Sequence, residues 1–261
     1  MPEGPVDDVP RSGEPGKDGG EPVVSLADPH CHTVASDGMV SPAELVAAAR
    51  AAGLALIAVT DHDTMAATRE AWERGQEIGV AVVRGQEITT RWPAQTHVVG
   101  WFLERPIRSG MSLGDTIDAI HDQGGLAVIP HPFMPTYFAS CQPGMLARLI
   151  ERHPVDAIEV LHTAPMSAGR RRLLAAFYQA NRERLGAAVG ASDSHFGRHD
   201  LGGMVTEFDG LTAEDFRAAV LGRRTRPRVG GRATVPLGLA LRQQWRSLVD
   251  LPLRRLRHRL P

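Results

Sequence analysis

The sequence predicts a single α/β barrel, in which parallel strands are covered by helices. Short apolar runs, rich in Val and Ile and bounded by Gly, Pro, Asp or Ser, alternate with longer amphipathic stretches. Seven such units favour a closed barrel over an open sheet, since no glycine-rich nucleotide-binding motif follows the first run. The length of 261 residues is normal for one barrel of this class.

Seven apolar runs are the predicted strands, at residues 23–27, 54–60, 80–84, 97–102, 126–130, 157–161 and 187–190. Helical stretches lie between most of them. Ser41 is a predicted N-cap, because Pro42 follows at the first helical position and Glu44 is placed to complete a capping box. Thr212 opens a later helix in the same way.

Composition divides the chain into three parts. Residues 1–22 are rich in Pro, Gly, Asp and Glu with almost no apolar residues, so we expect a disordered tail. Residues 23–225 carry the alternating pattern and are the predicted barrel. Residues 226–261 are a basic extension, predicted to be part helical because Leu241 and Trp245 fall at helical spacing.

The basic extension has two interpretations. Residues 223–261 hold eleven arginines against a single acid, Asp250. The helix either packs back on the barrel or contacts an anionic partner such as RNA or a membrane surface.

Charge and cysteine content limit the class of protein. A net charge of −1 gives the whole chain no strong attraction to nucleic acid or acidic membranes. Cys31 and Cys141 are too few for a disulfide framework, which favours a reducing compartment. The N-terminus lacks the apolar region of a secretory signal, and no run reaches the ~20 apolar residues of a membrane span. We expect a cytoplasmic protein with no transmembrane segment.

Histidines and carboxylates gather around the ends of the predicted strands. They are His30, His32, Asp37, Asp61, His62, Glu87, His97, His131, Asp193 and His195. The carboxyl ends of parallel strands meet at one face of a barrel, so these side chains are expected to converge there. Imidazole together with carboxylate suits zinc, manganese or iron. Each motif alone has an ordinary loop or turn explanation, but their recurrence at one strand end after another predicts a metal site.

These motifs resemble the PHP (polymerase and histidinol phosphatase) family of metal-dependent phosphoesterases. His30-Cys31-His32, followed by Asp37-Gly38 and later by Asp61-His62, is similar to the small stand-alone members that hydrolyse nucleotides. The resemblance spans about residues 24–225. It implies a distorted (β/α)7 barrel with a three-metal cleft at the C-terminal ends of the strands.

The resemblance also implies a set of nine ligands for two or three divalent ions, Mn2+, Zn2+ or Fe2+. They divide as His30, His32, Glu87 and Asp193 for the first ion, Glu87 again with His97 and His131 for the second, and Asp37, His62 and His195 for the third.

The expected activity is hydrolysis of small phosphomonoesters or nucleotides by attack of a metal-bridging hydroxide. Two catalytic roles are predicted from position: Asp61 orients histidine ligands, and His195 lies near the water that protonates the leaving oxygen. Substrate contacts are predicted for His162, after the sixth strand, and for Arg198 and His199, after the last.

Three other functions fit parts of the pattern. The same metals would serve a 3'-5' exonuclease on short oligonucleotides, which is favoured by the short connection after Phe102, where nucleotide-hydrolysing relatives often carry a helical insertion. A non-catalytic metal-binding regulatory module would keep the ligands without turnover. An amidohydrolase also begins with His-x-His but usually bridges its metals with a lysine, and Lys17 in the tail is the only lysine here.

Overall fold

A computed structural model describes residues 23–136, 138–231 and 234–250 of the chain. The tail predicted for residues 1–22 lies outside the described residues, as do residues 251–261 of the basic extension. No helix in the described ranges is long and apolar enough to cross a membrane.

The strands form one mixed sheet of nine members in the described residues. They are β1 (Val24–Cys31), β2 (Leu56–Val59), β3 (Ala81–Thr89), β4 (His97–Trp101), β5 (Leu126–Ile129), β6 (Ala157–His162), β7 (Ala187–Ala191), β8 (Met204–Asp209) and β9 (Arg226–Val229). Their order is β7-β6-β5-β4-β3-β2-β1-β8-β9. The sheet curls until β7 reaches β8, where Gly190 N donates to Thr206 Oγ1 over 3.0 Å, so the barrel is nearly closed and the predicted fold class is confirmed.

The expectation of an entirely parallel sheet is wrong at β4. This strand pairs antiparallel with both β3 and β5, and Thr89 lies opposite His97. The cause is the connection at residues 90–96, which is far shorter than the dozen or more residues that a parallel crossover needs. Because β4 is reversed, its beginning lies at the same end of the barrel as the carboxyl ends of β1, β2 and β3.

Two strands, β8 and β9, are not among the predicted ones. They pair antiparallel with each other, and β8 also pairs antiparallel with β1. Arg228 in β9 bonds to Glu207 in β8 over 2.7 Å, a cross-strand ion pair at the edge of the sheet. The sheet therefore includes residues 226–229, which the composition assigns to the basic extension.

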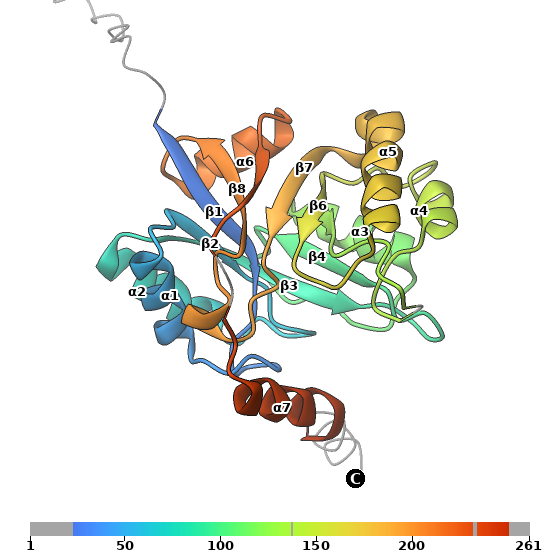
Figure 1. The fold of residues 1–261 in the computed structure, drawn as a ribbon. Coiled ribbons are helices and arrows are strands. Elements are labelled where there is room, and N and C mark those ends of the chain that lie inside the picture. Colours follow the sequence, from blue (N-terminus) through green and yellow to red (C-terminus); the bar gives the residue numbers. More distant parts are fainter. Residues whose placement is uncertain (1–22, 137, 232–233, 251–261) are drawn as a thin grey trace, which may run out of the picture.

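Helices cover the sheet from the outside. They are α1 (Pro42–Ala51), α2 (Thr68–Ile78), α3 (Leu113–His121), α4 (Pro143–Leu149), α5 (Ala168–Leu185), α6 (Ala213–Leu221) and α7 (Leu237–Trp245), with short turns η1 (Gly197–His199) and η2 (Arg246–Asp250). Figure 1 shows α1 and α2 on one side of the molecule and α3, α4 and α5 on the other. Both predicted capping boxes, at Ser41 and Thr212, are present.

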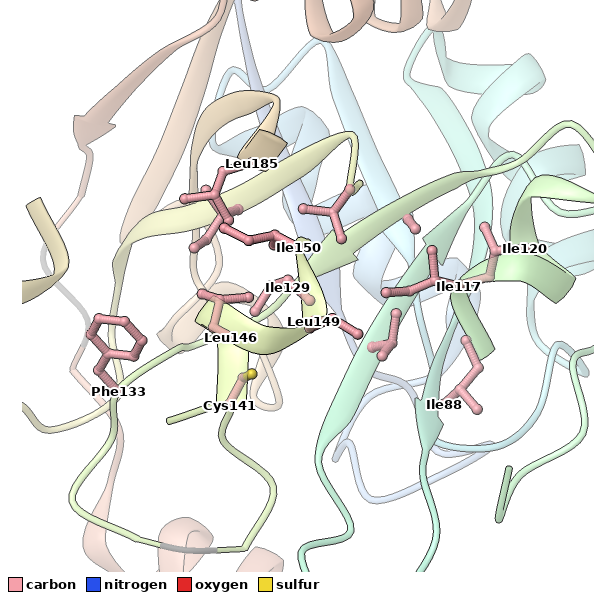
Figure 2. Close-up of a cluster of buried hydrophobic side chains, with 14 of the residues drawn as sticks. Ile88, Ile117, Ile120, Ile129, Phe133, Cys141, Leu146, Leu149, Ile150 and Leu185 are labelled. Carbon is pink, nitrogen blue, oxygen red and sulfur yellow. The ribbon is translucent and has the colours of Figure 1, made fainter. Parts of the chain in front are cut away.

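Apolar side chains fix each helix layer to the sheet. Ile117, Ile129, Leu146 and Leu185 belong to one buried cluster that joins β5 to helices α3, α4 and α5 (Figure 2). Burying a side chain of this size contributes roughly 1.5–3 kcal/mol. This packing gives the strand ends a rigid base on which polar side chains are placed.

Candidate metal centre

His30, near the end of β1, and His32, just beyond it, face the same point, next to an irregularity in the strand. The pairing of β1 with β2 shifts register between Asp28 and Cys31. Trp101 Nε1 donates to the carbonyl of Pro29 over 2.9 Å, which holds the irregular backbone. The Nε2 atoms of His30 and His32 lie 3.1 Å apart. Residues two positions apart on a strand point to the same face, so the His-x-His spacing itself favours a shared point.

The first group of potential ligands consists of His30, His32, Glu87 and Asp193. One donor atom from each lies within 4.8 Å of the others. His32 Nε2 is 3.2 Å from Glu87 Oε2 and 3.1 Å from Asp193 Oδ1. Both histidines are fully buried. These are the four residues that the resemblance assigns to one ion.

The second group uses the other oxygen of Glu87. Glu87 Oε1 lies 2.7 Å from His97 Nδ1 and 3.0 Å from His131 Nε2. His97 reaches this point only because β4 is reversed. The two carboxylate oxygens of Glu87 thus face two different sets of histidines, as a bridging ligand does.

A third group joins His32, Asp37, His62 and His195, again with donor atoms within 4.8 Å of one another. Asp37 Oδ1 is 3.2 Å from His195 Nε2. His62 faces two ways, because its Nε2 is 3.9 Å from Asp37 Oδ2 and its Nδ1 is 3.1 Å from Glu87 Oε2. His62 can therefore serve either the second or the third group.

The donor atoms face one another in a way that fits divalent cations. Three buried atoms, His62 Nδ1, His97 Nδ1 and Asp193 Oδ1, have no hydrogen-bond partner among the described residues. Yet His97 Nδ1 lies only 2.7 Å from a Glu87 oxygen. Buried polar atoms normally form hydrogen bonds. Imidazole and carboxylate atoms that face one another without such bonds fit a site for a shared divalent ion.

The charges in the cluster also favour cations. Burial raises the pKa of the Glu87 carboxyl, but His62, His97 and His30 outweigh it and hold that pKa well below its usual range. Burial also raises the pKa of Asp193, but His30 and His195 outweigh this effect and hold that pKa well below its usual range. Burial lowers the pKa of His62 to about 3. Burial also lowers the pKa values of His30, His32, His131 and His195, but the neighbouring carboxylates outweigh it and raise them. Metal binding requires neutral imidazoles beside ionised carboxylates, so a cation that enters the cluster displaces these protons.

Glu159 in β6 supports the cluster and is not among the residues predicted from the sequence. Its Oε1 accepts from His30 Nδ1 over 2.8 Å, and its Oε2 accepts from the backbone N–H of His131 over 2.7 Å. The proton on His30 Nδ1 leaves Nε2 free to bind a cation. The sequence does contain a usable signal, because Glu159 is an acid inside the apolar run 157–161. A carboxylate buried in a strand requires hydrogen-bond or charged partners.

Asp61 organises a turn rather than a histidine. Its carboxylate accepts from Thr33 N and Thr33 Oγ1, both over 2.8 Å, and from Ser36 Oγ over 2.6 Å. It reaches His32 only through Ser36 Oγ, which lies 3.4 Å from His32 Nδ1. Asp61 thereby fixes residues 33–37, the segment that carries Asp37 into the third group.

The predicted substrate contacts separate in the structure. His162 is nearly buried beside the cluster, and neither of its ring nitrogens has a hydrogen-bond partner among the described residues. Arg198 and His199 instead line a pocket between α1, η1 and α7, and none of the nine predicted ligands is part of that lining. Their prediction as contacts in the metal cleft therefore gains no support from this position.

The fold is an α/β barrel that carries, at one end, a cluster of histidines and carboxylates that could hold metal ions. The PHP domain family model matches residues 28–220, and the chain belongs to this family. The predicted family is thus confirmed, and with it the class of metal-dependent phosphoric ester hydrolase.

Three relatives illustrate the similarity. The uncharacterized protein MJ1587 of Methanocaldococcus jannaschii is 36% identical over 42% of this chain and 68% of its own length. The 3',5'-nucleoside bisphosphate phosphatase of Chromobacterium violaceum is 27% identical over 74% of this chain and 73% of its own length. A 5'-3' exoribonuclease of Haemophilus influenzae is 46% identical, but the match covers 28% of this chain and 27% of that protein.

Solved structures share the fold. A two-domain protein of Bacteroides vulgatus that contains a PHP-like metal-dependent phosphoesterase superposes with a TM-score of 0.66 at 21% identity, covering 92% of this chain and 75% of that one. A metal-dependent phosphoesterase of Bifidobacterium adolescentis gives a TM-score of 0.59 at 21% identity over 84% of this chain and all of that one.

Proposed function

We propose that this phosphoesterase hydrolyses small phosphomonoesters or nucleotides. The arrangement of Glu87 carries the proposal, since its two oxygens face two separate groups of histidines. Such an arrangement suits adjacent cation positions, the layout that stabilises both oxygens of a phosphoryl transfer. The 3',5'-nucleoside bisphosphate phosphatase, which aligns with most of this chain, supports a nucleotide carrying a terminal phosphate as the substrate.

The nine predicted ligands would hold two or three ions, and their mixture of imidazole and carboxylate suits Mn2+, Zn2+ or Fe2+. Such ions lower the pKa of water and neutralise the nonbridging oxygens of the phosphate. The chain positions these ligands in advance through Glu159 and Asp61. His62, His97, Asp193 and His195 keep 14–24% of their side-chain surface exposed, so substrate enters on their side.

His162 is the proposed contact to the phosphate. Burial lowers the pKa of its imidazole, so the ring is neutral near pH 7 and carries one N–H donor. Neither ring nitrogen makes a hydrogen bond of ordinary geometry to the described residues, and a phosphate oxygen would compete with the Pro132 backbone for that donor. His195 remains the proposed group at the leaving-oxygen side, where a proton must be supplied from solvent, and Asp61 the proposed organiser of the turn.

A second candidate is an exonuclease on short RNA. The exoribonuclease relatives are named for 5'-3' action, opposite to the direction considered from the sequence, so a 5'-phosphate end is the one to test. The arginines of the extension would supply attraction to an anionic partner, although those beyond residue 250 lie outside the described residues. The two buried free cysteines are consistent with the proposed cytoplasmic location.

The test is purification without chelator, metal analysis, and assays with p-nitrophenyl phosphate, a nucleotide panel and a 5'-labelled oligonucleotide. His131→Ala and Asp193→Ala are compared with His153→Ala, whose histidine pairs with Asp118 away from the cluster. Two or three metal equivalents, with turnover lost only in the first two variants, support the proposal. Bound metal without turnover on any ester, even with added Mn2+, would favour the regulatory module or an amidohydrolase.

A further inference from the structure

The C-terminal helix α7 contacts the barrel through polar side chains. Gln243 is its one buried residue, whereas Leu237, Leu241 and Trp245 are 62–74% exposed. A helix that docks through an apolar face shows the opposite pattern. In Figure 1, α7 lies below the barrel, at the end where β1 and β2 terminate. This placement brings Gln243 to the metal centre.

Gln243 and its neighbours hold the edge of the third group. Gln243 Nε2 donates to Asp37 Oδ2 over 3.3 Å. Gln244 Nε2 donates to Gln243 Oε1 over 3.0 Å, which fixes which end of the Gln243 amide faces Asp37. Arg246 donates from Nε to the Ser36 carbonyl over 3.0 Å and from its terminal nitrogen to the Val34 carbonyl over 2.6 Å.

Asp37 therefore contacts both the histidines of the cluster and α7. Asp37 Oδ1 faces His195 Nε2 at 3.2 Å and His32 Nδ1 at 3.6 Å, inside the third group. Asp37 Oδ2, which lies 3.9 Å from His62 Nε2, also takes the hydrogen bond from Gln243. With one oxygen held by an amide, the carboxylate cannot rotate freely, and its other oxygen stays aimed at the histidines.

We propose that Gln243 is a positioning residue that completes the third cation site, and that Arg246 clamps the turn carrying Asp37. The proposal rests on the proposed function only in assuming that the cluster binds cations. Asp37 belongs to neither of the other two groups of potential ligands. Loss of α7 contacts is therefore expected to weaken one cation site and to leave two unchanged.

The test measures metal binding directly. Full-length wild type and Gln243→Met are stripped with chelator, dialysed and titrated with Mn2+ by calorimetry, and bound metal is counted after gel filtration. Methionine keeps the length of glutamine but cannot donate the hydrogen bond. We expect the weakest of three sites to lose about tenfold in affinity, the typical effect of losing a group that orients a ligand, with the two tighter sites unchanged.

Matched variants separate positioning from general damage. Arg246→Ala is expected to weaken the same site, whereas Arg242→Ala, an exposed arginine on the same helix, is expected to match wild type. Thermal unfolding of each metal-free variant checks the fold. Equal weakening of all sites, or three unchanged affinities in Gln243→Met, would overturn the proposal. Because the readout is binding, a failure of the phosphoesterase assay leaves this result intact.

Activity adds a second readout. Gln243→Met is expected to need about tenfold more Mn2+ for half-maximal turnover and to regain wild-type kcat at saturating Mn2+, with KM for the ester unchanged. A kcat that stays low at saturating Mn2+ would mean that Gln243 does more than hold Asp37, and would overturn the positioning role.

Discussion

Replacing Glu159 with glutamine tests whether the carboxylate in β6 sets the protonation of the cluster. Glu159 accepts two hydrogen bonds, from His30 Nδ1 and from the backbone of His131. Glutamine has one acceptor oxygen and one NH2 group, so one of these two donors must face another donor. If NH2 faces His30, the imidazole avoids the clash by moving its proton to Nε2, the atom that must be unprotonated to bind a cation.

The magnitude follows from that loss. A buried donor left without an acceptor costs about 1–3 kcal/mol, and each 1.4 kcal/mol is about tenfold in affinity. The first cation group is therefore expected to bind roughly 10- to 100-fold more weakly, the range usual for groups that orient a ligand. In metal-free protein the tautomer shift relieves the clash, so unfolding temperature is expected to change little.

The assay is Mn2+ titration of metal-free protein by calorimetry, with turnover of p-nitrophenyl phosphate measured across Mn2+ concentrations. Glu151→Gln, which removes an exposed acid just after α4, is the matched control. Wild-type Mn2+ affinity in Glu159→Gln would refute the argument that Glu159 fixes the tautomer of His30.

Three further predictions concern the turn held by Asp61, the two cysteine thiols, and the ion pair of His121 with Asp156. Asp61→Asn is expected to reduce turnover and metal content about tenfold; full activity with full metal content would remove Asp61 from the site. Burial raises the pKa of Cys141 to about 12 and that of Cys31 well above its usual value, so a thiol reagent should label neither until the protein unfolds. The hydrogen bond with Asp156 raises the pKa of His121. This pair stabilises the folded protein by at most about 1 kcal/mol. The stabilisation is complete below the unfolded-state pKa of His121 and is lost as the pH rises through its folded-state pKa. A His121→Gln variant whose stability falls as steeply as that of the wild type when the pH rises above the unfolded-state pKa of histidine would refute that assignment.

Most members of the histidine and carboxylate cluster could be predicted because they lie within or just beyond a strand that the sequence pattern defines, whereas Asp37 lies on a turn. The direction of β4 could not be predicted from its composition, because a run of apolar residues is compatible with both parallel and antiparallel pairing. The length of the connection at residues 90–96 was the usable signal, because a crossover does not fit into it. If β4 were parallel to its neighbours, His97 at its start would lie at the opposite end of the barrel from the site, which is built at the strand carboxyl ends.

The supporting residues were harder to predict, because their roles depend on partners distant in sequence. Glu159 reaches His30 across 129 positions, and Gln243 reaches Asp37 across 206. Nothing in the sequence near Gln243 indicates that this glutamine contacts the cluster. The basic extension had two interpretations, packing on the barrel or contact with an anionic partner. Within the described part, Arg246 binds backbone carbonyls of this chain.

The three groups differ in how the fold supports them. His30 and Glu87 stand on paired strands of the barrel, over a buried apolar core. Asp37 stands on a turn, held on one side by Asp61 and on the other by α7. A site built on strands is held more accurately than one built on a loop. The barrel itself therefore preorganises the first two proposed cation sites, whereas the affinity of the proposed third site is expected to depend on the contacts of α7, and we expect a chelator to empty that site first.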